Sequence, residues 1–158
     1  MAGIPLPEAQ AVGELLGQLV DKEVVVEKCP KVDARAASPT SVYVGDDDAV
    51  RALCVCELEL AAHLGAALGM MPVGAAKDAV AAGALPEGLQ LNFREVMNIC
   101  AAMLCANGSP HVRLLDAFPS QEAAGAAAQK VAKSPAKRVD YQVAIDGFGG
   151  GKLAFLLG

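Results

Sequence analysis

The sequence predicts an α+β fold in which an antiparallel sheet has helices packed on one face. The first observation is a pair of β-branched segments joined by Gly45-Asp46-Asp47-Asp48, which is typical of a β-hairpin. The second is a similar pair around the glycines near the C-terminus. The third is a helical periodicity in the segments that precede each pair. Hairpins build antiparallel sheets, and such sheets bury one face against helices.

Length and composition are consistent with one domain over residues 1–158. The chain is 54% hydrophobic and 20% charged, and it contains no Trp. Its core must therefore consist mainly of Ala, Val, Leu and Met.

The first part of the chain combines helix and strand signals. A helix is expected over 7–20, where apolar residues recur at helical spacing after two prolines. Strands are expected at 22–28, 40–45 and 50–56, with a Pro- and Ala-containing connection at 29–39.

The remainder begins with three helices, expected at 58–68, 74–82 and 88–106, the last ending at Asn107-Gly108. A strand follows at 111–117. Residues 118–137 are low in complexity and suit either a helical turn or a mobile loop. A final hairpin is expected from 138–146 and 152–157.

The order of these elements is repeated. Helix, strand, connection and hairpin occur in residues 7–56 and again in 88–157, with the linking helices at 57–83 between them. The two halves do not align residue by residue, so the repeat is one of pattern. We expect a pseudo-twofold arrangement of two helix-strand-hairpin units.

The helix at 88–106 contains a polar pair opposite its apolar stripe. Glu95 and Asn98 lie together on the outer face of a helical wheel, with the uncharged neighbours Leu91 and Ala102. Such a pair suits either an ordinary solvated helix face or a docking surface. The stripe is formed by Phe93, Val96, Met97, Cys100, Met103 and Leu104.

These features resemble the CheC/CheX/FliY group of chemotaxis phosphatases. The similarity covers most of the chain in element order, and its specific part is Glu95-x-x-Asn98 on the helix that opens the second half. Two positions depart from the family motif. Leu91 stands where the family has Asp or Ser, and Pro119 lies about two residues before the expected Pro.

The resemblance implies removal of phosphate from the phosphoaspartate of a CheY-like response-regulator receiver domain. Asn98 would orient the attacking water, and Glu95 would fix the docking of the receiver. No cofactor of its own is implied, because the Mg²⁺ is expected on the receiver. Glu14 is followed by Gly17 where a second motif would need Asn, so the chain looks like the single-site CheX type, which pairs as a homodimer.

Two alternatives from other functional classes stay open. The same fold could bind a receiver without catalysis, which Leu91 favours. It could also serve as a scaffolding dimer that has no receiver partner.

Charge and composition argue against several other classes. The net charge of −5 provides no electrostatic support for nucleic-acid binding, and the basic residues near 130–138 are sparse. The N-terminus lacks a signal-peptide pattern, and no apolar stretch is long enough to cross a membrane. Five cysteines in largely apolar surroundings indicate a reducing compartment, so we expect a cytoplasmic protein.

Other chemistry-bearing residues are weaker candidates. Cys54-x-Cys56 places two thiols on one face of a strand but has no matching second pair of ligands. His63 lies on an apolar helix, and His111 opens a strand without a nucleophile nearby. The acids of the 46–48 turn are typical turn residues, and the glycines at 147–151 suit a flexible hairpin.

Overall fold

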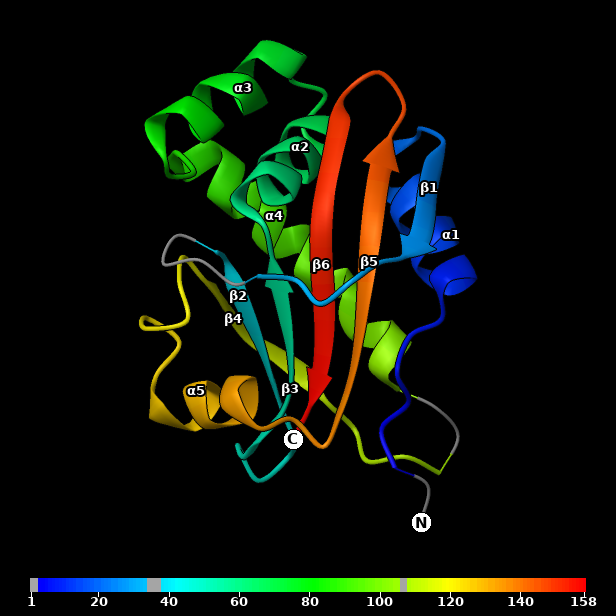
Figure 1. The fold of residues 1–158 in the computed structure, drawn as a ribbon, viewed down its shortest axis with the longest axis vertical. Coiled ribbons are helices and arrows are strands. Elements are labelled where there is room, and N and C mark those ends of the chain that lie inside the picture. The colour runs from blue at the N-terminus through cyan, green and yellow to red at the C-terminus, as the bar shows by residue number, and fades with distance from the viewer. Residues whose placement is uncertain (1–2, 34–37, 106–107) are drawn as a thin grey trace.

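The computed structural model describes residues 3–33, 38–105 and 108–158 (Figure 1). Its centre is a six-stranded antiparallel sheet in the order β1-β5-β6-β3-β2-β4. The strands are β1 (Val24–Lys28), β2 (Thr40–Val44), β3 (Val50–Cys56), β4 (Arg113–Phe118), β5 (Lys137–Ile145) and β6 (Gly149–Leu157). The helices are α1 (Ala9–Val20), α2 (Leu58–Leu68), α3 (Val73–Ala82), α4 (Glu87–Cys100) and α5 (Ala126–Lys133). A 3₁₀ turn at Ala101–Leu104 follows α4.

The sheet has the expected pseudo-twofold order. The central strands β3 and β6 pair with each other, and each half contributes one helix, one single strand and one hairpin. The single strands cross over: β1 pairs with β5 of the second half, and β4 pairs with β2 of the first half. Each half therefore completes its sheet only with a strand from the other half.

One face of the sheet forms the main core. Alternate residues of β3 and β6 point to this face, as the period of two in a strand requires. Helices α1, α2 and α4 cover it, and α3 packs outside α2 through small residues. The largest fully buried side chains of this core include Tyr43, Tyr141, Phe93, Phe155, Leu16 and Leu60.

The opposite face of the sheet is covered by α5 and by residues that follow β1. Ala128 and Val131 of α5 pack against a cluster that includes Leu53 and Leu156. The sequence left open whether residues 118–137 form a helical turn or a loop. The structure shows that they contain α5, which lies on the face of the sheet opposite α1, α2 and α4 (Figure 1). Small residues at helical spacing allow α5 to approach the sheet closely.

An ion pair supports the same face where the chain leaves β1. The guanidinium Nη2 of Arg138 lies 2.8 Å from Asp140 Oδ2, and the amide of Val32 donates to the same oxygen at 2.7 Å. Burial raises the pKa of Asp140, but the hydrogen bonds from Arg138 and Val32 outweigh it and lower that pKa. The pair joins β5 to the segment that follows β1.

Two boundaries differ by three or more residues from the sequence-based expectation, and the others that shift do so by one or two. The α-helix expected to Ala106 ends at Cys100 and tightens into the 3₁₀ turn; residues 106 and 107 lie outside the described part. The glycines at 149–151 belong to β6 and not to the turn, which lies at 146–148. Gly150 is required in the strand, because a Cβ there would collide with the carbonyl oxygen of Val143.

Candidate functional site on helix α4

Two polar contacts, one buried and one partly buried, fix helix α4 to the rest of the fold. Near its C-terminal end, the Tyr43 hydroxyl donates to the carbonyl oxygen of Met97 at 2.7 Å. Burial raises the pKa of Tyr43 well above its ordinary value, so its hydroxyl stays protonated as a donor. The Asn92 amide donates to Gly65 O of α2 at 3.0 Å. A Cβ at Gly65 would lie 2.8 Å from Leu89 O, so this glycine permits the close packing of α2 and α4.

The predicted pair, Glu95 and Asn98, lies on the outward face of this fixed helix. Both side chains are exposed, whereas Val96 and Met97 between them are buried. Neither the Glu95 nor the Asn98 side chain has a hydrogen-bond or ion-pair partner among the described residues. The carboxylate and the carboxamide are therefore one helical turn apart and free to contact another molecule.

The surroundings of the pair are partly apolar and partly charged. Leu91, one turn before Glu95, exposes 60% of its surface. Arg94 is beside Glu95 in sequence, but its Nε donates to Asp116 Oδ1 of β4 at 2.9 Å. Because Arg94 is engaged with Asp116, the charge of Glu95 is not neutralised by that neighbour.

Pro119 lies in a hollow beside the first turns of α4. It follows β4 directly and lines a small hollow together with Gln90, Leu58 and Pro39. The Gln90 amide donates to Ala117 O at 2.7 Å, which places this part of the chain beside the first turns of α4. Gln90 precedes Asn98 by about two helical turns, or roughly 12 Å.

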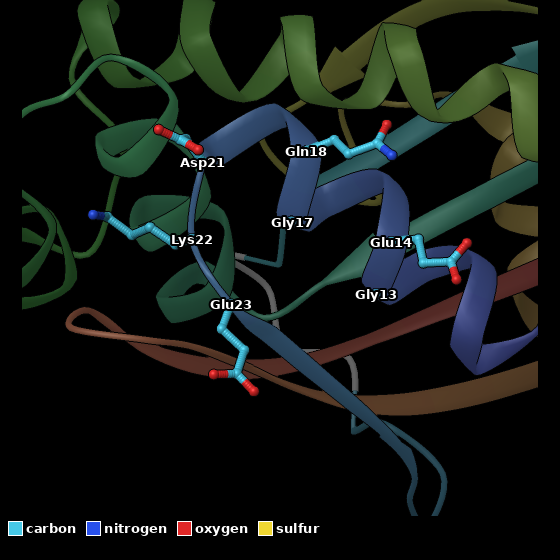
Figure 2. Close-up of a pocket in the computed structure, with 7 residues that line it drawn as sticks. All are labelled: Gly13, Glu14, Gly17, Gln18, Asp21, Lys22 and Glu23. Carbon is cyan, nitrogen blue, oxygen red and sulfur yellow. The ribbon is translucent and has the colours of Figure 1, made fainter.

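The equivalent face of α1 carries a glutamate, Glu14, but has Gly17 where α4 has Asn98. Glu14 is exposed and accepts a hydrogen bond from Gln10 at 3.1 Å. A Cβ at Gly17 would lie 3.2 Å from Lys22 O, because the chain turns back closely after α1. The shallow hollow here has glycines on the helix and charged side chains around it (Figure 2). A side chain at position 17 would be crowded against the Lys22 carbonyl oxygen, which disfavours the asparagine of a second motif there.

Three of the five cysteines form a buried group without metal-site geometry. Cys54 and Cys56 share a face of β3, with their Sγ atoms 3.9 Å apart, and Cys100 is buried nearby in the same core. The hydrogen bond with Cys56 and burial raise the pKa of Cys54, and burial raises that of Cys100. These thiols are therefore protonated. Across the described ranges, no three His, Cys, Asp or Glu residues are grouped to hold a metal ion.

The histidines and the aspartate turn have structural contacts. His63 is 4% exposed and lies edge-to-face with Phe148 at 6.4 Å between ring centroids. The 46–48 acids face basic side chains: His111 Nδ1 lies 3.3 Å from Asp46 Oδ1. The other two pairs are Asp47 with Arg51 and Asp48 with Arg113. The turn is thus tied to β3 and β4, a pairing that the sequence did not reveal.

Sequence reasoning identified the outward pair but missed the residues that position α4. Tyr43 and Met97 are 54 positions apart, and Asn92 and Gly65 are 27 positions apart. No periodicity or motif links such distant residues. The buried aromatic in β2 was the available signal, because a buried Tyr hydroxyl generally finds a partner.

Comparison with known proteins identifies the fold. No protein-family model and no curated protein sequence matches the chain. The chain is similar to the FliM middle domain from H. pylori, with a TM-score of 0.62 and 12% identity over 94% of this chain and 84% of that one. It is similar to Thermotoga maritima FliY, with a TM-score of 0.55 and 13% identity over 95% and 89%.

A third similar structure is the FliM-SpeE complex from H. pylori, at a TM-score of 0.52 and 9% identity over 94% of this chain and 80% of that one. The chain therefore has the fold of the FliM middle domain and FliY. The resemblance to the group that includes FliY is confirmed at the level of fold, as is the α+β class. In the part of the chain that the structure describes, no helix is long and apolar enough to span a membrane.

Proposed function

We propose that the outer face of α4 removes phosphate from the phosphoaspartate of a response-regulator receiver domain. The observation that carries this proposal is the free carboxylate and carboxamide of Glu95 and Asn98, exposed one turn apart. The anchoring of α4 by Tyr43 and Asn92 supports it, because a water-orienting group must be held firmly to be effective. The fold shared with FliY supports it further.

The chemistry requires little from this chain. A phosphoaspartate is an acyl phosphate, which is already activated toward hydrolysis. The carboxamide of Asn98 can accept a hydrogen bond from water and donate one to a phosphoryl oxygen. Attack in line forms the bond from water oxygen to phosphorus and breaks the bond to the aspartyl oxygen, releasing phosphate and the carboxylate. The Mg²⁺ belongs to the receiver, which is the substrate.

Glu95 has a different role in this proposal. A carboxylate beside the phosphoryl group would repel its oxygens, so Glu95 is suited to pair with a basic side chain of the receiver. Its lack of an ion-pair partner within the described ranges leaves it available for this contact. Receiver domains of this type are cytoplasmic, and we place the protein there.

The test is the rate of phosphate loss from a phosphorylated CheY-like receiver. Wild-type protein should accelerate the loss, and Asn98→Ala should reduce the acceleration by at least about tenfold, since removal of one positioned catalytic group commonly costs 10²-fold or more. Gln18→Ala removes an exposed carboxamide from α1 and is the matched control. Equal rates for wild type and Asn98→Ala would refute the proposal.

A second candidate is receiver binding without catalysis, or a scaffolding homodimer on the same fold. The exposed Leu91 favours docking, because it adds an apolar contact where the motif has a polar residue. In this case the receiver binds and its phosphate lifetime does not change. Sedimentation of the protein alone distinguishes a homodimer from a monomer that awaits its partner.

A further inference from the structure

A second surface, distinct from the outer face of α4, is hollowed between α3 and the start of α4. We call it the α3–α4 groove; its volume is about 500 Å³. The residues that line it are Met71, Ala75, Asp78, Ala79, Ala82, Ala84, Leu85, Pro86 and Leu89. Helix α3 forms one wall, and the short connection 83–86 with the first turn of α4 forms the other.

The floor of the groove is apolar and formed by small side chains. Ala79 and Leu89 are buried at its base, and alanines along α3 keep the wall low. The neighbouring Met70 exposes 93% of its surface and has the left-handed backbone angle φ of 53°. This conformation is uncommon outside glycine. Methionine adapts its shape readily, which suits the lining residue Met71 to contact a docked apolar side chain.

The charged side chain that lines the groove is the carboxylate of Asp78. Glu87 is exposed directly after the lining residue Pro86. Neither carboxylate has an ion-pair partner within the described ranges. Lys77, the residue before Asp78, is not among the lining residues. Helix α3 therefore presents its aspartate, and not its lysine, to the groove.

We propose that the α3–α4 groove binds a basic amphipathic helix of a partner protein. Apolar side chains spaced three and four residues apart would enter the groove, and a flanking Lys or Arg side chain would meet Asp78 in its wall. The wall formed by α3 is ten residues long, and a helix of that length spans about 15 Å, enough for two to three turns of the partner. A second copy of this chain fits less well, because its net charge is −5.

The groove and the polar pair of α4 use different sides of one helix. Leu89 and Pro86 face the groove, whereas Glu95 and Asn98 face outward beyond the next turns. Occupation of the groove is therefore compatible with a partner on the outer face. The test of the groove does not depend on phosphatase activity.

The experiment uses a leucine–lysine peptide of about three helical turns as the probe. A peptide of the same composition with the leucines out of helical register is its control. Binding is followed by fluorescence anisotropy, and the site is mapped by amide chemical shifts of the labelled protein. We expect binding of the amphipathic peptide alone, with shifts centred on residues 71–89.

Two variants probe the groove itself. Asp78→Lys reverses the charge at the rim and should weaken binding about fivefold, as expected for an exposed ion pair. Ala82→Gln fills the groove without adding charge and should also weaken binding. Glu27→Lys reverses an exposed charge on β1 and should have no such effect. Circular dichroism confirms that each variant is folded.

Four outcomes would overturn the proposal. They are equal binding of both peptides, indifference to Asp78→Lys, shifts centred on residues 91–98, and a homodimer in sedimentation that Ala82→Gln dissociates. The last outcome would assign the groove to a second copy of the chain.

Discussion

Replacing Tyr43 by Phe tests whether a single buried hydroxyl holds the functional end of α4. Tyr43 is fully buried, and its hydroxyl lies 2.7 Å from Met97 O. In a regular α-helix the Ala101 amide would donate to Met97 O, four residues earlier. Here it donates to Asn98 O and Ile99 O instead, and the Tyr43 hydroxyl is the donor to Met97 O. Phe leaves that carbonyl without this donor.

The expected cost is the desolvation penalty of one buried polar group, about 1–3 kcal/mol in the free energy of unfolding. In a domain of this size, the melting temperature should fall by roughly 2–4 °C for each kcal/mol. Urea unfolding measures the free energy. Hydrogen exchange should show faster exchange in the last turn of α4 and in Ala101–Leu104.

Tyr141→Phe is the matched control, because its buried hydroxyl donates to Pro7 O at the same distance of 2.7 Å. It should cost a similar free energy but leave exchange in α4 unchanged, since it holds the segment before α1. A cost below about 0.5 kcal/mol for Tyr43→Phe would refute the reasoning, because it lies under the range for an unsatisfied buried carbonyl. Equal effects of both variants on α4 would refute it as well.

Three further predictions concern stability. Gly150→Ala should destabilise the fold by about 3 kcal/mol or more, because the new methyl group meets the Val143 carbonyl. Gly88→Ala should stabilise it by about 0.5–1 kcal/mol, because a methyl group there meets no other atom and Ala favours the helix. Denaturant unfolding compares the two variants, and an equal cost would contradict the packing argument. Burial lowers the pKa of His63 in the folded state below 6.5, so the free energy of unfolding should fall as pH drops through and below about 6.5. Measured between about pH 5 and 7, the free energy of unfolding should depend less steeply on pH in His63→Gln than in wild type. An unchanged pH dependence would show that His63 is not its source. Asp140→Ala leaves Arg138 unpaired and should cost about 3 kcal/mol, with the wild-type contribution lost as pH falls below 4; a variant as stable as wild type would show that the pair contributes nothing.

Most of the helices and strands could be predicted from residues close together in sequence. The bounds of β3 and α2 were predicted at both ends, because turn residues and a change of period mark them within a few positions. The glycine run before the C-terminus was misassigned to a turn, since composition alone does not show that β6 must pass close to Val143. The position of α5 was open because the sheet face that it covers is formed by residues of β2, β3 and β6, which are distant from α5 in sequence.

The candidate site was predictable in part for the same reason. Helical periodicity is local, so the exposure of Glu95 and Asn98 was correctly expected from their spacing. Their catalytic role stays a prediction. The contacts that hold their helix, from Tyr43 and to Gly65, join residues distant in sequence and could not be inferred from it.

The sequence by itself determined most of the helices and strands, the two hairpins, and the direction in which Glu95 and Asn98 point. These features depend on interactions within a few residues. Only the tertiary structure decided that β1 pairs with β5 and β4 with β2, so that the two halves complete one sheet. That pairing depends on burial of a shared core, to which residues of both halves contribute and which no single segment encodes.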